Sequence, residues 1–215
     1  MRTSDVLLRE WQQREGRANA DLRSAVCPNC EGSLAKTPKR RTTCAGCGGV
    51  IVVRRGLLCT EDEGVLVTWF ENLQNYGATL PLLAHVAAEL RDGIGRTPPV
   101  RDVVWGMMNH LVGTHGQSEL AAHVYRAMAR FVLEEERDPK PYQELAAIID
   151  LRSLRDQGFT HVRTFGVPDD RQCRGCREAA KRRMIVEEAL RDLPAPRSCT
   201  STEGCRCGYL ADVSL

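Results

Sequence analysis

The stretch "CRGCREAAKRRMIVEEALRDLPAPRSCTSTEGCRC" (173–207) contains five cysteines, whereas a closed zinc site takes four thiolates. Cys173 and Cys176 form a CxxC pair, in which a tight turn brings two thiolates to one ion. Cys199 follows "LPAPRS", where two prolines are expected to hold the chain extended and deliver the thiol to a defined place. The sequence therefore offers three ligands directly and leaves the fourth to the last pair of cysteines.

Cys205 and Cys207 are two residues apart, so in an extended strand both thiols would point the same way. Either one can complete a tetrahedron, and Cys205 is preferred. A second ion is not expected, because only one thiolate would be left for it. The predicted ligands of a single zinc ion are Cys173, Cys176, Cys199 and either Cys205 or Cys207.

The pattern "DDRQCRGC…LPAPRSCTSTEGCRCGYL" resembles the terminal segment of certain uncharacterised bacterial proteins. Those segments have a CxxC, a short helix, "LP", a Cys-Thr and a closing "CRC" with a tyrosine. The likeness extends over about 118–210, because "YRAMARFVLEEERDP" fits their helical part. More remotely, the segment is similar to the tail of phage Mu F-like head-morphogenesis proteins, which carry a CxxC and a terminal CRC. The resemblance implies a fold, a metal site and a bacterial or phage source, but no activity.

A second set of cysteines lies near the other end of the chain, with CxxC, thirteen intervening residues and CxxC. Two such pairs can complete a tetrahedron around one structural zinc ion. The segment 27–58 resembles a zinc ribbon, with "CGG" and the apolar strand "GVIVV" (49–53) after the second pair. A thioredoxin-like redox site is disfavoured, because neither pair begins a helix in a βαβ setting. The predicted ligands of this second zinc ion are Cys27, Cys30, Cys44 and Cys47, and Cys59 is interpreted as a buried thiol.

Charge is unevenly distributed along the chain. Residues 27–56 contain six basic residues and one acid, residues 57–170 contain 10 and 17, and residues 171–192 contain seven and four. Basic ends and an acidic middle favour different partners for different segments, or ends that fold back on the middle. The basic residues at the ends have two interpretations: they contact nucleic acid, or they form an ordinary solvated surface. The candidate contacts are Lys39, Arg40, Arg41, Arg54, Arg55, Lys181, Arg182 and Arg183.

The hydrophobic period of the middle of the chain is helical. Helices are predicted over 63–77, 79–93, 118–137 and 138–158, with a break at "IGRTPPV" (94–100), a short strand at 161–167 and a further helix over 177–193. In the third helix, one apolar stripe contains Leu120, Val124, Met128, Phe131 and Val132. The fold class is thus mainly α, a helical-hairpin body flanked by two cysteine modules. The predicted division is an N-terminal helix (1–26), a zinc ribbon (27–60), an all-α body (61–160) and a C-terminal zinc module (161–215).

Several kinds of chemistry find no support in the sequence. Both cysteine sets are closed and contain no histidine, whereas a catalytic zinc keeps an open position. We find no H-x-E element of a deaminase, phosphate-binding loop, nucleophile elbow or dinucleotide fingerprint. An enzyme is therefore possible but not indicated, and no catalytic residue is predicted. The absence of a signal-peptide stretch and of a long apolar run predicts a cytoplasmic protein without a membrane partner.

Three functions are consistent with this pattern. The first is a non-enzymatic zinc protein that binds DNA or RNA, as a regulatory or accessory factor. The second is a scaffold for protein interactions, in which the basic ends meet an acidic partner or the acidic middle of the chain. The third is a thiol redox protein. The first two functions require two zinc ions. The third requires a CxxC that is free of metal.

Overall fold

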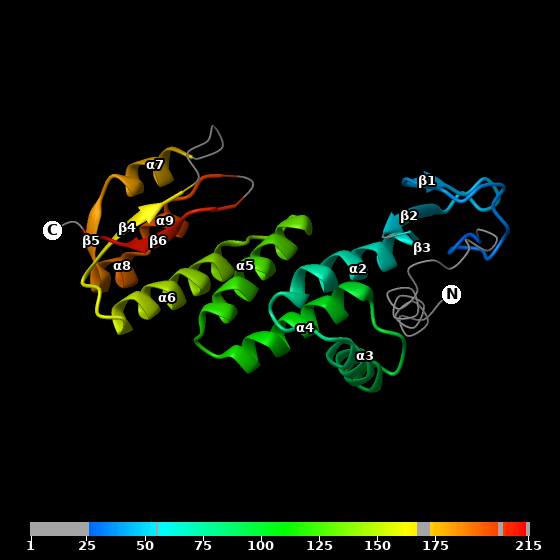
Figure 1. The fold of residues 1–215 in the computed structure, drawn as a ribbon, viewed down its shortest axis with the longest axis horizontal. Helices are drawn as coiled ribbons and strands as arrows, with labels where there is room; N and C mark the ends of the chain where they lie inside the picture. The colour runs from blue at the N-terminus through cyan, green and yellow to red at the C-terminus, as the bar shows by residue number, and fades with distance from the viewer. Residues whose placement is uncertain (1–25, 55, 167–172, 202–203, 214–215) are drawn as a thin grey trace. The chain divides into compact units, whose positions relative to one another are not determined.

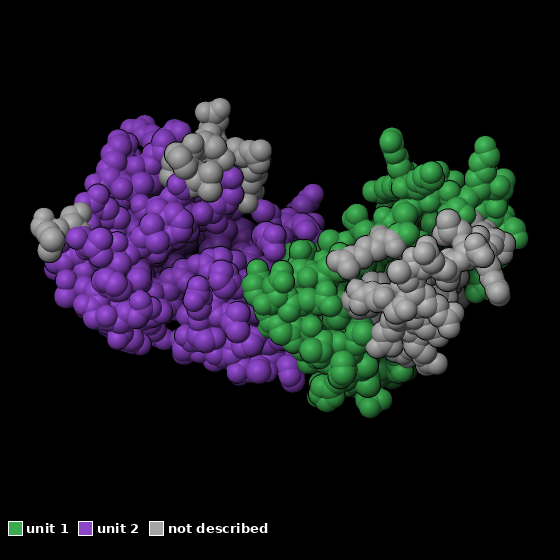
Figure 2. Space-filling model, viewed as in Figure 1, with its two compact units in different colours: residues 1–107 green, residues 108–215 purple. Residues whose placement is uncertain are grey.

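The computed structural model describes residues 26–54, 56–166, 173–201 and 204–213. Helices predominate among them, as the sequence predicts. Contacts divide the chain into two compact units, 1–107 and 108–215 (Figure 2). The predicted body over 61–160 contributes to both units, and the four-part division of the chain stays a prediction. The helix predicted within 1–26 lies outside the described residues.

Unit 1 begins with a three-stranded antiparallel sheet in the order β1-β2-β3 (Figure 1). Its strands are β1 (Thr42–Thr43), β2 (Val50–Arg54) and β3 (Leu57–Cys59). The apolar run predicted as a strand is β2, the central one, as expected for β-branched residues. Ile51 is fully buried there beside Cys27 and Cys44. The small core of this region thus consists largely of cysteines.

Helix α2 (Glu61–Gln74) starts at a capping box directly after the sheet. Thr60 Oγ1 accepts the N–H of Glu63 at 3.2 Å, and Glu63 Oε2 accepts the N–H of Thr60 at 2.8 Å. These two bonds satisfy backbone donors that a helix start leaves without intrahelical partners. A Cβ at Gly64 would lie 2.9 Å from Val52 Cγ1, so the glycine lets α2 pack closely on β2.

Two further helices follow, α3 (Leu80–Ile94) and α4 (Val100–His115). Helix α3 ends at Gly95, whose φ of 69° suits a left-handed cap, and not at the predicted Gly93. Helix α4 was not predicted individually, although the helical period covered it. Gly106 lets it approach α3, since a Cβ there would lie 2.6 Å from Val86 Cγ1.

Unit 2 contains the helical pair α5 (Glu119–Glu134) and α6 (Lys140–Asp156), both predicted from the sequence. The predicted apolar stripe of α5 is buried except for Leu120, which is 41% exposed. Small side chains, Ala121 and Ala122 of α5 and Ala146 of α6, pack with Ile149 between the two helices. Arg126 of α5 also forms an ion pair with Asp150 of α6.

The C-terminal part of unit 2 is a second antiparallel sheet, in the order β5-β4-β6. Its strands are β4 (His161–Phe165), β5 (Arg183–Ile185) and β6 (Gly208–Ala211). Three short helices accompany them: α7 (Arg174–Ala180), α8 (Val186–Asp192) and α9 (Pro194–Arg197). In Figure 1 these elements surround the sheet at the end of the chain.

Three local predictions in this region are wrong. The helix predicted over 177–193 is interrupted, because residues 183–185 pair with β4 as strand β5. "LPAPRS" is not extended but contains helix α9, whose first residue is a proline; this position needs no backbone N–H and suits the fixed φ of proline. The pair Cys205 and Cys207 precedes β6 and does not lie in a strand.

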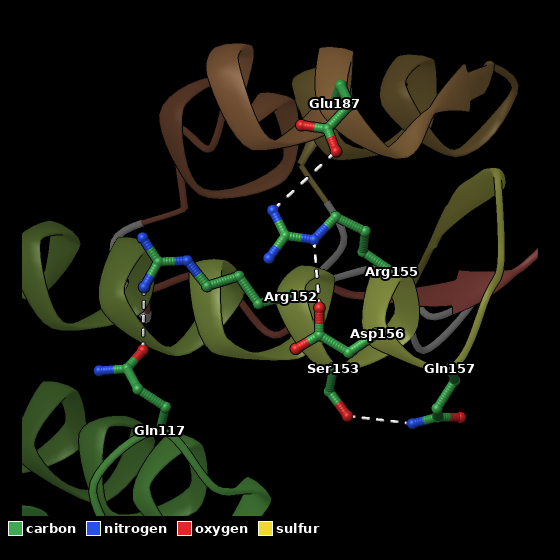
Figure 3. A network of polar contacts seen from close by, with 7 residues as sticks. All are labelled: Gln117, Arg152, Ser153, Arg155, Asp156, Gln157 and Glu187. Carbon is green, nitrogen blue, oxygen red and sulfur yellow. Dashed lines mark hydrogen bonds and ion pairs between the residues drawn. The ribbon is translucent and has the colours of Figure 1, made fainter.

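The core of the C-terminal sheet includes one face of α6. Leu151 of α6, Val162 of β4 and Met184 of β5 are buried in one cluster with Tyr209 of β6. A polar contact also joins α6 to α8 (Figure 3): Arg155 Nη1 lies 3.9 Å from Glu187 Oε1. Helix α6 is therefore an integral part of the packing of the C-terminal cysteine region.

One carboxylate connects all three strands of this sheet. Asp212 Oδ2 lies 3.0 Å from Nε of Arg163 in β4 and 3.0 Å from Nε of Arg183 in β5. The side chain of Asp212 is only 3% exposed, whereas both arginine side chains are about half exposed. Two cations thus neutralise a largely buried anion just after β6.

None of the helices in the described parts of the chain is both long enough and apolar enough to span a bilayer.

Candidate metal centres

The N-terminal metal group consists of Cys27, Cys30, Cys44 and Cys47, whose four Sγ atoms all lie within 4.8 Å of one another. The Sγ atoms of Cys27 and Cys47 are 3.9 Å apart, and those of Cys30 and Cys44 are 4.0 Å apart. Four sulfurs at about 2.3 Å from a tetrahedral zinc ion would be about 3.8 Å from one another. The group predicted from the sequence could therefore hold a metal ion.

The two CxxC turns of this group have the same backbone hydrogen bonds. The N–H of Cys27 donates to Gly32 O at 2.8 Å, and that of Glu31 donates to Cys27 O at 2.9 Å. In the second turn, Cys44 and Gly48 donate to Gly49 O and Cys44 O, each at 2.9 Å. The fifth residue of each turn has a positive φ, 60° at Glu31 and 72° at Gly48. The turns are thus copies of one local motif, which presents two thiols to the same point.

Proton affinities differ strongly within the N-terminal metal group. Burial raises the pKa of Cys27, but hydrogen bonds from the N–H groups of Asn29 and Cys30 outweigh this effect and lower the pKa to about 6. The N–H of Gly49 lowers the pKa of Cys47, but the neighbouring sulfurs raise it to about 12. Without metal, the group therefore holds a thiolate at neutral pH and retains protons that a divalent ion would displace.

The C-terminal metal group brings all five cysteines together, but as two overlapping triads. Cys173, Cys176 and Cys199 form one triad, and Cys176, Cys205 and Cys207 form the other, with all Sγ atoms of a triad within 4.8 Å of one another. The distance from Cys173 Sγ to Cys199 Sγ is 3.9 Å, and that from Cys176 Sγ to Cys205 Sγ is 3.7 Å. The sequence identified these five thiols but not the double membership of Cys176, which spacing does not reveal.

The first triad is held by the start of α7 and the end of α9. Cys173 is the N-cap of α7, and its Sγ accepts the N–H groups of Cys176 and Thr200, each at 3.4 Å. Burial raises the pKa of Cys173, but these N–H groups lower it to about 6. A Cβ at Gly175 would lie only 2.1 Å from Ser198 O, next to Cys199. A residue without a side chain is thus required for α7 to reach α9 and bring the triad together.

The second triad is positioned by the backbone around Ala195 and by β6. Sγ of Cys205 lies 3.5 Å from Ala195 O, and the N–H of Ala195 donates to Tyr209 Oη at 3.2 Å. The neighbouring thiol of Cys207, and burial, raise the pKa of Cys205. Burial raises the pKa of Tyr209 to about 12, so its hydroxyl stays neutral and accepts this bond. The fixed Tyr209 links α9 to the strand that follows the two cysteines.

Cys59 is fully buried and belongs to none of these groups, which agrees with its interpretation as a buried thiol. No histidine belongs to the metal groups found among the described residues. Two histidines instead face glutamates one helical turn away: His85 Nε2 lies 3.5 Å from Glu89 Oε2, and His123 Nε2 lies 3.7 Å from Glu119 Oε1.

The basic residues predicted as nucleic-acid contacts have different surroundings. Arg41 pairs with Glu61, Lys181 Nζ lies 2.9 Å from Glu178 Oε1, and Arg183 pairs with Asp212. These three contacts occupy basic groups with carboxylates of the same chain. Arg55 lies outside the described residues. The remaining four are exposed: Lys39, Arg40, Arg54 and Arg182.

No protein-family model matches the chain, and the searches of curated proteins and of solved structures find no match.

Proposed function

We propose that this chain is a non-enzymatic zinc protein in which each cysteine region binds metal and residues 27–60 form a zinc ribbon. The observation that carries the proposal is the N-terminal metal group, whose sulfurs stand 3.9 and 4.0 Å apart, close to the edges of a zinc tetrahedron. The repeated turn motif supports it, because both pairs of thiols are presented in the same way. Zinc would give a small region with little apolar core the stability it needs to fold.

The purified chain tests the metal directly. Elemental analysis is expected to find zinc. A chelator should remove the zinc and unfold residues 26–59. A purified protein that is folded and free of metal would contradict the proposal. Iron in place of zinc would retain the sites but change their chemistry, and would be recognised by visible absorption.

We propose that the metal-stabilised ribbon binds nucleic acid through its exposed basic residues. Lys39 and Arg40 are exposed between the two CxxC turns, and Arg54 is exposed at the end of β2. Four thiolates around a divalent ion would leave about −2, which lowers the net charge of residues 27–56 from +5 to about +3. The surface would remain basic enough for contacts with phosphate groups.

A salt titration of DNA and RNA binding tests this function. Changing Lys39, Arg40 and Arg54 together to glutamine should weaken binding and reduce the slope of log K against log salt by up to about 2.7 for duplex DNA. A matched control changes three basic residues that already pair with carboxylates, Arg41, Lys181 and Arg183, and should leave the slope nearly unchanged. An affinity for nucleic acid that changes neither with salt nor in the first variant would exclude this function.

The second candidate is a protein-interaction scaffold. It is favoured by the same three ion pairs, which show basic side chains of both cysteine regions in contact with carboxylates. An acidic partner would use the four exposed basic residues in that way. Capture of a partner that survives nuclease treatment and is lost in the triple glutamine variant would support the scaffold over nucleic-acid binding. The resemblance to bacterial and phage proteins stays a prediction.

A further inference from the structure

The C-terminal metal group does not have the geometry of one closed four-thiolate site. In the N-terminal metal group, all four sulfurs lie within 4.8 Å of one another. In the C-terminal group, Cys205 is grouped with Cys176 and Cys207, and not with Cys173 and Cys199. One ion bound equally by four of the five sulfurs would require the two triads to merge. Two ions would fit them as they stand.

We propose that the C-terminal metal group holds two divalent ions, with the thiolate of Cys176 bridging them. The proposal rests on the proposed function, because it assumes that the cysteines bind zinc. Cys173 and Cys199 complete the first triad, and Cys205 and Cys207 complete the second. A thiolate sulfur has three lone pairs and can bind two ions at once. The chain would then bind three ions, one in the N-terminal metal group and two here.

Charge favours this arrangement. One ion with four thiolates would leave about −2 in a partly buried site, with a fifth thiol beside it. Two divalent ions with five thiolates would leave a net charge of about −1. Because Cys176 and Cys199 are buried, at 2% and 6% exposure, the smaller net charge costs less desolvation.

Three thiolates for each ion leave a fourth position open, and for the second ion this position borders a cavity. A cavity of about 480 Å³ in unit 2 is lined by Cys205 and Cys207 and by Arg126 and Asp150 of the helical pair. An open position beside a cavity is the arrangement of a metal site that exchanges ligands. Arg126 and Asp150 form an ion pair in this lining, so the cavity is polar and suits a small polar ligand.

A cobalt(II) titration of the full chain carrying Cys27→Ser and Cys30→Ser tests the proposal, because these changes remove the N-terminal site and leave unit 2 intact. Cobalt(II) replaces zinc and its visible spectrum reports thiolate ligands. We expect binding of two cobalt ions, and coupling through the shared sulfur should reduce the electron paramagnetic resonance signal as the second ion enters. Saturation at one cobalt ion overturns the inference while leaving the proposed function intact. No binding of cobalt or zinc by the native chain contradicts the proposed function itself.

Single variants in the same background distinguish a bridge from a spare thiol. Cys207→Ser should reduce the ratio from two ions to one, and Cys176→Ser should abolish both sites. If Cys207 is only a spare thiol beside one ion, its loss leaves the ratio at one. Cys59→Ala is the matched control, because it removes a buried thiol outside the metal groups and should leave the ratio at two.

Azide tests the open position on the cobalt-loaded protein. It should change the ligand-field spectrum of one of the two ions without changing the metal ratio. Two bound ions with a spectrum that azide leaves unaltered would retain the bridge and overturn the open position.

Discussion

The two cysteine regions bring their thiols together in different ways. The N-terminal metal group is local: its four cysteines lie within 21 residues, in two turns with identical hydrogen bonds, and the small core beside them buries Cys27, Cys44 and Ile51. The C-terminal metal group depends on a fold: three strands, three short helices and one face of α6 hold its five thiols. If both groups bind metal as proposed, the metal would be the main source of stability in the first region and an addition to a packed core in the second.

Removal of metal should produce the largest difference in stability between the two regions. Structural zinc contributes about 10–16 kcal/mol of binding free energy in small zinc domains, and that energy is also their folding energy. A chelator should therefore abolish amide protection throughout residues 26–59, while the backbone amides of α5 and α6 keep theirs. Hydrogen exchange followed by mass spectrometry measures both regions in one sample. Equal loss in both would refute the contrast.

Leu151→Ala should destabilise the C-terminal region and leave the N-terminal region unchanged. Leu151 is fully buried in the core shared by α6 and the C-terminal sheet, so its truncation should lower the unfolding free energy of that region by about 2–5 kcal/mol. Chemical denaturation, followed by thiol accessibility in each region, measures the change. The midpoint for the N-terminal metal group should stay constant; a shift there would show that the two regions unfold together.

Two glycines in equivalent positions sharpen the comparison. Gly175 and Gly46 each precede the second cysteine of a CxxC, but an added Cβ would meet Ser198 O at 2.1 Å in the first case and Cys44 Sγ at 3.8 Å in the second. Gly175→Ala should therefore destabilise its region by about 1–3 kcal/mol through overpacking. Gly46→Ala is the matched control and should change stability by less than about 0.5 kcal/mol. Thermal unfolding of the zinc-loaded proteins measures both.

The smallest effect concerns the repeated turn of the N-terminal metal group. Glu31 has a φ of 60° at the position where the second turn has Gly48. Because a side chain is strained in this conformation, Glu31→Gly should stabilise the metal-loaded region by up to about 1 kcal/mol. The reverse change, Gly48→Ala, should cost a similar amount. Zinc competition with a chromogenic chelator measures both; weaker binding after Glu31→Gly would show that the turns are not equivalent.

The sequence predicts local features of this molecule well and long-range ones poorly. Spacing and periodicity predict the grouping of four cysteines near the N-terminus, the strand at 50–54 and helices α5 and α6, because each depends on neighbouring residues. Strand β5 was hidden within a helical pattern, since only pairing with β4 makes it a strand. The division of five thiols into two triads depends likewise on how α7 meets α9 and on where β6 begins.

The Asp212 clip, which consists of the ion pairs of Asp212 with Arg163 and Arg183, affects the order in which the molecule can be assembled during synthesis. The ligands of the N-terminal metal group have all been made by residue 47, so that region can bind metal early. In the C-terminal sheet, β4 is central, and its partner β6 and the clip follow only at 208–212. Until then, one edge of β4 is open to other strands, and an open edge favours aggregation. A ribosome that stalls between β5 and β6 would leave the chain with an exposed strand edge and an incomplete set of thiols.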